Sequence, residues 1–440
     1  LPHFGAVQSL GPRYLGLGQS EQDGRYLAYL EEGKYDVTGT TTSDDGRFNA
    51  YTAFRRYSSA IERLSGGKLY VLDRGVFAHY YLPTGLYTVA GAELSGSTNA
   101  QLTYAFVRGA AKQYGTLLLS NVCSFTRWGH KIPADPSPTP SCERGSDHGD
   151  TCGTSYSSMK RLLYTLMSYD TATAGFEVYY YSPVNKSLLT PIGRIQARAK
   201  TFAEAHPLSE RGVHIASTAI LLDYFAGWEA PCAATDNGWP FTSGFGQTAY
   251  SAPDFLADGI FDLVWPGYRN AGFFHDASFE LTPTPWGDVF DVLLSDVSAD
   301  LLSRYDTVIV GHALQSNSLT VADRLEQFVT GGGQLTVMFD SLADLGSAGE
   351  KLVGNASRTG HGLHGSCTLY DSVRVTFVDG STVQEPHPQR ICVLQPPSGA
   401  RVLATAVVVA GSVGGDVKTA AVPVAFRTQP NERGGSVTVI

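Results

Sequence analysis

Strand-like and helix-like patterns of hydrophobic and polar residues alternate through the first half of the chain. Strand-like segments are rich in β-branched and aromatic residues, as buried strands are, and read YLGLGQSE, YDVTGTTT, KLYVLD, LYTVAGAE, TLLLSNVCSF and GFEVYYY. Between them, apolar residues recur every three or four positions, which is typical of helices. Repeated strand–helix units predict parallel strands with helices outside. A run of this length favours a (β/α)8-type (TIM) barrel over an open sheet, although fewer than eight strands are recognisable.

Two of the helices are expected over definite ranges. One is expected from Asn99 to Tyr114. The other has Thr190 as its N-cap, Pro191 in its first turn and Pro207 as its stop, in the positions where these residue types are favoured. The barrel is therefore assigned to residues 1–208. It is interrupted at 131–153 by a Pro/Ser-rich stretch that cannot bury a core and is expected on the surface.

The second half predicts two further regions. Strands in HIASTAILLDYF, FDVLLSD, DTVIVGH and QLTVMFD alternate with helices such as VADRLEQFVTGGG, which predicts a flavodoxin/amidotransferase-like α/β domain over 209–350. It has no cysteine in a G-x-C-x-G elbow, so we expect it to mediate self-association, with Trp265 and Trp286 as exposed interface aromatics. Residues 351–440 are mostly strand-like and form a β-rich C-terminal region. The sequence ends on a strand, so the natural chain is expected to continue.

Composition narrows the class of partner. The chain has 440 residues, 17% charged, with a net charge of −9, and no basic block, which argues against nucleic acid. No apolar run reaches the roughly 18 residues of a membrane span. The sequence starts at Leu1, which we interpret as a mature end after removal of a signal peptide. Two glycosylation sequons, at Asn185 and Asn355, favour a secreted or cell-surface glycoprotein.

Six cysteines support the same oxidising environment. The local pairs are expected to be Cys142–Cys152 and Cys367–Cys392. Elimination leaves Cys123 with Cys232.

Two isolated carboxylates are the candidate chemistry. From Gly75 to Val107, Glu93 is the only Asp, Glu, Lys or Arg, and Glu177 is the only formal charge in TATAGFEVYYYSPVN. Burying an unpaired charge is costly, so each is paired, protonated or functional. Both follow strand-like runs, and the site of a barrel lies at the carboxyl ends of its strands. Two such carboxylates are what glycoside hydrolysis requires, although each could instead pair with an arginine or cap a helix.

Other polar and aromatic residues near strand ends are candidate glycan contacts. Each could equally be an ordinary loop or core residue. They are Gln19, Asp73, Asn121, Trp128 and Tyr179.

No metal or cofactor is predicted. The G-x-S-x-G elbow and the phosphate-binding GxxxxGK[ST] pattern are both missing from the sequence. His361, His364 and Cys367 lie close together but match no strong zinc spacing.

The order of segments is similar to that of barrel β-galactosidases with a trimerisation domain and their secreted relatives. The segments that carry this resemblance are AILLDYFAGW, RYDTVIVGHAL, VADRLEQFVTGGGQLTV and the closing RVLATA, PVAFR and GGSVTVI. The resemblance implies a Glu acid/base on the fourth barrel strand and a Glu nucleophile on a late strand, positions that Glu93 and Glu177 fit. This sequence departs from the family pattern at Ala92, the residue before Glu93, where those enzymes usually have Asn.

Two functions follow as hypotheses. The first is a secreted glycoside hydrolase-like protein, retaining, acting on β-linked glycans such as galactose-containing ones, and forming a homo-oligomer. The second is a non-catalytic extracellular glycoprotein that uses the same scaffold for assembly or glycan binding. Low charge, many tyrosines, the Pro-rich insertion and Ala92 favour the second, and the paired carboxylates favour the first.

Overall fold

The structure is a computed structural model. It describes residues 11, 17–18, 69–70, 78–85, 87–94, 99–122, 148–149, 154–176, 181–182, 184–226, 252–268, 281, 284–314, 318–353, 367–370, 372–387, 389–392, 394–410 and 418–440. Residues 131–147 and 150–153 of the Pro/Ser-rich stretch lie outside these residues.

The chain folds into two compact units. The first comprises Leu1–Ala216 with Phe225–Leu293, and the second comprises Ser217–Tyr224 with Leu294–Ile440. The division of the chain into domains at 1–208, 209–350 and 351–440 stays a prediction. Each compact unit is described by itself below.

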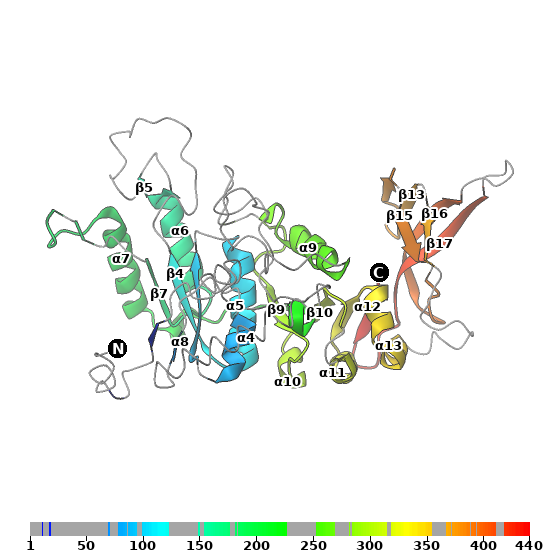
Figure 1. The fold of residues 1–440 in the computed structure, drawn as a ribbon, viewed down its shortest axis with the longest axis horizontal. Coiled ribbons are helices and arrows are strands. Elements are labelled where there is room, and N and C mark those ends of the chain that lie inside the picture. Colours follow the sequence, from blue (N-terminus) through cyan, green and yellow to red (C-terminus); the bar gives the residue numbers. More distant parts are fainter. Residues whose placement is uncertain are drawn as a thin grey trace, which may run out of the picture. The chain divides into compact units, whose positions relative to one another are not determined.

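The first unit contains short parallel strands, as the alternating pattern predicts (Figure 1). Strands β3 (Val89–Leu94), β4 (Leu117–Val122) and β7 (Thr173–Phe176) form one parallel sheet in that order. Two smaller parallel pairs join β1 (Leu17–Gly18) to β2 (Leu69–Tyr70) and β5 (His148–Gly149) to β6 (Thr154–Ser155). A mixed α/β architecture is confirmed, while closure into a barrel stays a prediction.

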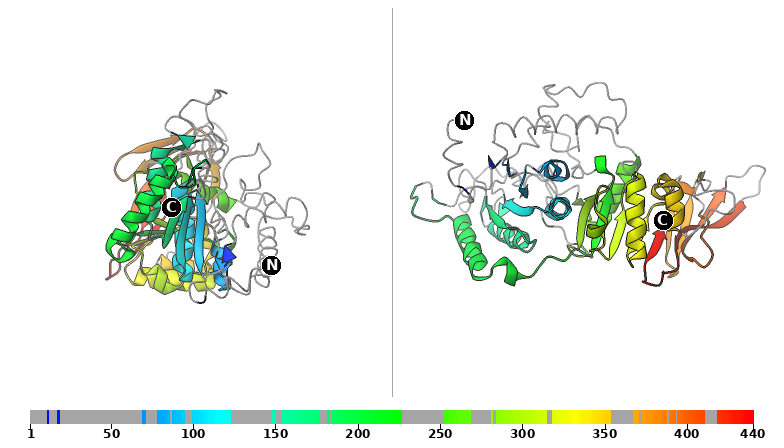
Figure 2. Two further views of the ribbon diagram at one scale, coloured as in Figure 1. Left: turned by 90° about the vertical axis from the view of Figure 1, so that its left-hand side faces the viewer. Right: turned by 90° about the horizontal axis from the view of Figure 1, so that it is seen from below.

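The helices of this unit begin and end close to the predicted residues. Asn99 is the N-cap of α5 (Ala100–Tyr114), and Thr190 is the N-cap of α7 (Pro191–Ala205), so both predictions are confirmed. Helices α6 and α7 pack against β7 (Figure 2). The other helices are α4 (Ala78–Tyr81), the 3-10 turns η2 (Leu82–Thr84) and η4 (Tyr224–Ala226), α6 (Tyr156–Met167), α8 (Leu208–Arg211) and α9 (Ala252–Val264).

Helix α5 is buried on every side over its first three turns, from Ala100 to Ala111. The Asn99 side chain accepts hydrogen bonds from the backbone N–H groups of Gln101 and Leu102, at 2.9 and 3.1 Å. Gly115 ends the helix with a left-handed φ of 67°, a conformation that glycine adopts without strain. Such a helix has no solvent-facing side, so every polar residue on it needs a partner.

The second unit is built on one continuous sheet. Its parallel part runs β8 (Thr218–Leu222), β10 (Thr307–Val310), β11 (Gln334–Val337) and β18 (Ser436–Val439). From β18 the sheet continues antiparallel through β17 (Lys418–Arg427), β16 (Arg401–Ala410), β13 (Val373–Phe377) and β14 (Thr382–Glu385). The β-rich C-terminal region therefore extends the sheet of the α/β region.

The parallel strands share a buried layer. Ala219, Val308, Leu335 and Val437 are register partners across β8, β10, β11 and β18, and none is more than 1% exposed. Strands covered on both faces are expected to be apolar throughout. The other described elements of this unit are the helices α10 (Ala299–Leu302), α11 (Ser318–Thr330), α12 (Phe339–Asp344) and α13 (Gly346–Leu352), and an antiparallel strand pair, β12 (Cys367–Tyr370) with β15 (Gln389–Cys392). Strand β9 (Phe290–Leu294) contains residues of both units.

Exposure corrects one expectation about interface aromatics. Trp286 is 55% exposed, but Trp265 is only 1% exposed. Trp265 packs among Phe261 and Phe290 instead, because it directly follows α9 and continues its apolar side. Self-association itself stays a prediction. No helix among the described residues is long and apolar enough to cross a membrane.

Candidate active site

The carboxyl ends of β3 and β4 bring two predicted residues into the described sheet. The register pairs Glu93 with Asn121 and Asn121 with Gly175. Register partners on neighbouring parallel strands point to the same side of a sheet. The backbone positions of Glu93, Asn121 and Gly175 therefore share one face.

The opposite face of these strands packs against helices. Phe176 is 2% exposed, and the Gln196 side chain of α7 donates to the Ala174 carbonyl at 3.2 Å. Burial raises the pKa of Tyr104 on α5 above its ordinary value, and the neighbouring Ser120 of β4 lowers it by less. Since side chains alternate along a strand, Asn121 points away from this helix layer.

Asn121 has an unusual environment for a buried amide. Its side chain is 7% exposed, and Nδ2 is buried without a hydrogen-bond partner in the described part of the chain. Leaving a buried donor unsatisfied costs about 1–3 kcal/mol. The neighbouring position on β7 is Gly175, which has no side chain to fill the space beside the amide. Asn121 is thus a donor aimed at the face that a barrel would enclose.

The remaining predicted site residues are not described to the same depth. The backbone of Glu93 lies in β3, but its side chain is outside the described part, so its distance from other groups is not defined. Gln19, Asp73, Trp128, Glu177 and Tyr179 lie outside the described residues, as do Cys123, Cys142, Cys152, Cys232 and Asn355.

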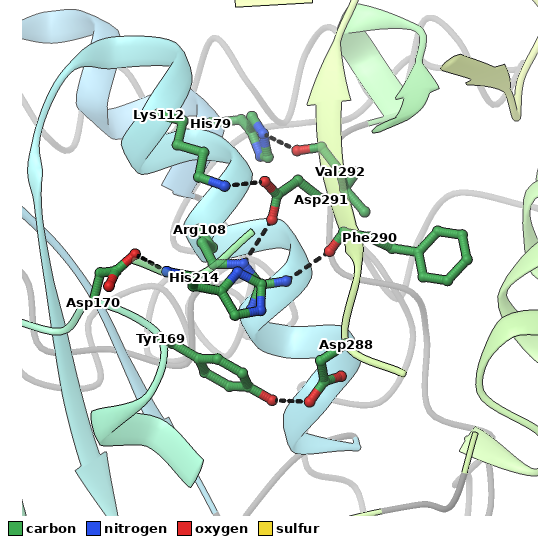
Figure 3. Close-up of polar contacts among 10 residues, drawn as sticks. All are labelled: His79, Arg108, Lys112, Tyr169, Asp170, His214, Asp288, Phe290, Asp291 and Val292. Carbon is green, nitrogen blue, oxygen red and sulfur yellow. Dashed lines mark hydrogen bonds and ion pairs between the residues drawn. The ribbon is translucent and has the colours of Figure 1, made fainter. Parts of the chain in front are cut away.

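Helix α5 also carries a buried ionic cluster that the sequence analysis missed (Figure 3). The Asp291 side chain is 0% exposed. Its Oδ1 accepts from Nε of Arg108 at 2.7 Å, and its Oδ2 accepts from Nζ of Lys112 at 2.6 Å. Burial alone raises the pKa of Asp291. The charges of Arg108 and Lys112 together lower this pKa by more than burial raises it, so it lies below the ordinary value.

Tyr169 and Asp288 extend this cluster. The Tyr169 hydroxyl donates to Asp288, which also accepts from the Gln101 side chain at 3.1 Å. The guanidinium carbon of Arg108 lies 4.7 Å from the Tyr169 ring centre, within cation–π range. Burial, followed by the charge of Asp288, raises the pKa of Tyr169 well above its ordinary value, so the phenol stays protonated.

Two histidines, His79 and His214, lie next to this ionic cluster, and both have lowered pKa values that keep their rings neutral. Burial lowers the pKa of His79 to about 3, against a smaller opposing effect of its hydrogen bond with the Val292 carbonyl at 3.1 Å. Burial and then the charge of Arg108 lower the pKa of His214 to about 4. The His214 backbone N–H donates to Asp170 at 2.7 Å.

This cluster holds the 288–292 segment against α5. Nη2 of Arg108 donates to the Phe290 carbonyl at 2.6 Å. His79 forms a hydrogen bond with the carbonyl of Val292, two residues further along the chain. A Cβ atom on Gly109 would lie 1.9 Å from the Val292 carbonyl oxygen, so only glycine allows this approach. The charges compensate one another, which is the pattern of a structural cluster. The signal in the sequence was the pair Arg108 and Lys112, one turn apart in a helix without other charged residues.

The second unit has a cleft of about 670 Å³ that contains none of the predicted site residues. Its polar lining includes Asp300, Asp306, Gln327 and Arg433. Among the described residues of either unit, no three His, Cys, Asp or Glu side chains are grouped to hold a metal ion.

Solved structures similar to this chain include several glycoside hydrolases. The β-galactosidase of Rahnella sp. R3 is 13% identical, with a TM-score of 0.42 over 95% of this chain and 56% of that one. The α-L-fucosidase isoenzyme 2 of Paenibacillus thiaminolyticus is 13% identical, with a TM-score of 0.46 over 93% and 54%. The exo-β-1,4-mannosidase Op5Man5 of Opitutaceae bacterium strain TAV5 is 13% identical, with a TM-score of 0.41 over 90% and 64%. The chain thus spans little more than half the length of the first two.

These likenesses are of fold only. No protein-family model matches the chain, and no curated protein matches it either.

Proposed function

We propose that the protein is a retaining glycoside hydrolase acting on β-linked glycans, with Glu93 as acid/base and Glu177 as nucleophile. The observation that supports this best is the register of Glu93, Asn121 and Gly175 at the carboxyl ends of three parallel strands. Glu177 follows Gly175 by two residues in the sequence, and strand alternation continued by one step would give it the same face.

Strand spacing makes the pair feasible. Neighbouring strands lie about 4.8 Å apart, so β3 and β7, which flank β4, are separated by roughly 10 Å. Two glutamate side chains that lean toward each other across this gap can bring their carboxyl groups to the separation of about 5–5.5 Å used in retaining hydrolysis. One carboxylic acid would protonate the leaving oxygen while the other carboxylate attacks the anomeric carbon.

Asn121 would serve binding. Its buried Nδ2 lies between these two strands and has no protein partner in the described part of the chain. A sugar hydroxyl at that position would accept its hydrogen bond and remove the cost of the unsatisfied donor. The proposed site thus contains a proton donor, a nucleophile and an orienting amide.

Two isosteric substitutions test the proposal. Glu177→Gln should lower hydrolysis of aryl β-glycosides, including β-galactosides, by several orders of magnitude with little change in melting temperature. Glu93→Gln should slow poor leaving groups more than good ones, because only poor ones need the proton. Glu204→Gln, on the exposed side of α7, is the matched control and should keep full activity.

The second candidate is a non-catalytic extracellular glycoprotein that binds glycans or assembles through this scaffold. Ala92 supports it, because the barrel enzymes that the sequence resembles usually have Asn before the acid/base. Absence of hydrolysis over a broad panel of β-linked glycans, together with binding of one of them that Asn121→Ala weakens, would favour this candidate over the enzyme.

A further inference from the structure

Residues 184–190, directly before α7, present a glycosylation sequon on a hydrogen-bonded loop. Tyr181 and Leu189 form an antiparallel bridge at its base, and the Ser182 backbone N–H donates to the Leu188 carbonyl at 2.8 Å. The Ser182 hydroxyl accepts from the backbone N–H groups of Val184 and Asn185, both at 3.3 Å. These bonds hold Asn185 at the exposed tip.

The Asn185 side chain is held through its amide oxygen. Oδ1 accepts from the Ser187 backbone N–H at 3.0 Å, and the Asn185 carbonyl accepts from Leu188 at 2.9 Å. Asn185, Lys186 and Ser187 are all exposed. Among the described residues, none forms a hydrogen bond with Nδ2 of Asn185. A substituent on this nitrogen would extend into solvent without breaking a contact of the folded chain.

The same loop exposes apolar side chains that the protein itself does not cover. Val184 is 95% exposed, Leu188 58% and Tyr181 57%. Single exposed apolar residues are common, but three on one short loop form a local apolar surface. Val184 directly precedes the sequon and Leu188 directly follows it, so a group attached to Asn185 lies beside them.

We propose that Asn185 carries an N-linked oligosaccharide that covers the apolar tip of this loop. The donor is an oligosaccharide attached to a polyprenyl diphosphate. The bond between Nδ2 and sugar C1 forms while the bond from C1 to the diphosphate oxygen breaks. The lipid diphosphate leaves with the electron pair, and Nδ2 loses one proton. The attached glycan is bulky and hydrophilic, and it suits an exposed loop. This inference does not depend on hydrolase activity.

Glycopeptide mass spectrometry tests occupancy. The full chain is expressed behind a secretion signal in a eukaryotic host, and peptides are treated with an amidase that converts glycosylated Asn to Asp in heavy-oxygen water. The peptide containing residue 185 should carry the label. Ser187→Ala should lose it, while Ser187→Thr should keep it and Asn355→Gln should leave it unchanged. An unlabelled Asn185 in the wild-type protein, whether secreted or retained in the cell, would overturn the proposal.

A second measurement tests shielding. Asn185→Gln should bind more of an environment-sensitive apolar dye than wild type. Adding Val184→Ser and Leu188→Ser to that variant should return dye binding to the wild-type level. Equal dye binding with and without the glycan would show that the oligosaccharide does not cover these side chains.

Discussion

Asp291 is the residue on which the buried charges of the first unit converge. Arg108 and Lys112 both contact its carboxylate, which is 0% exposed. We expect Asp291→Asn to lower the free energy of unfolding by about 3–5 kcal/mol, because it leaves a buried guanidinium without its counter-charge. Urea denaturation followed by fluorescence measures this. Asp379→Asn, on an exposed turn, is the control, and an equal loss in both variants would show that Asp291 does not anchor the cluster.

Gly109 permits a second prediction about a single residue. Alanine normally stabilises a helix interior over glycine by about 1 kcal/mol. Gly109→Ala should do the opposite, because its Cβ would lie 1.9 Å from the Val292 carbonyl oxygen. Gly259→Ala in α9, with nothing within 4 Å of the added carbon, should be neutral or stabilising. Thermal unfolding of both variants should therefore shift the melting temperature in opposite directions, and two upward shifts would contradict the close approach.

Among the secondary-structure elements, the β12–β15 pair carries the next prediction. Cys367 and Cys392 are direct register partners in this antiparallel pair, and opposite residues on such strands have Cα separations of about 4.5–5.5 Å. That range suits a disulfide. Peptide mapping without reduction should recover the two cysteines in one linked peptide. Free thiols at both positions in protein from an oxidising compartment would contradict the bond. The other two predicted pairs stay predictions.

What the sequence could predict at this scale depended on local signals. The ends of α5 and α7 were predictable because Asn99, Thr190 and Pro191 act within one turn of the helix they start. The partners of Arg108 were not, because Asp291 lies 183 residues away. Asn121 was predicted as a polar residue near a strand end, but whether its Nδ2 finds a partner in the described part of the chain depends on which neighbours face it across the sheet. The buried position of Trp265 was missed because loop composition does not report tertiary packing.

For the whole molecule, two neutral histidines, the buried His79 and the half-buried His214, predict sensitivity to acid. Their folded pKa values, about 3 for His79 and about 4 for His214, lie below the ordinary value of 6.5. Between these values the unfolded chain binds the proton and the folded chain does not, so stability is lost as pH falls below about 6.5. His79 alone should contribute a slope of about 1.4 kcal/mol per pH unit in this window.

Urea denaturation at pH 7, 6 and 5 measures that slope. His79→Gln should reduce it and leave the contribution of His214, because glutamine can still donate toward the Val292 carbonyl but does not titrate. His206→Gln, an exposed histidine at the end of α7, should leave it unchanged. The lowered pKa of Asp291 acts in the same direction at more acidic pH, so a wild-type stability that is flat from pH 7 to pH 5 would argue against the buried histidines.

The position of β18 has a consequence for how the second unit is made on the ribosome. This strand lies between β11 and β17, and its residue Ser436 bonds to a β11 residue 102 positions earlier in the chain. Until residues 436–439 have been translated, β11 and β17 each keep an unpaired edge, and such edges pair readily with other chains. The nascent polypeptide must therefore be kept from aggregating until β18 has been synthesised. Deletion of residues 436–439 would separate the parallel half of the sheet from the antiparallel half.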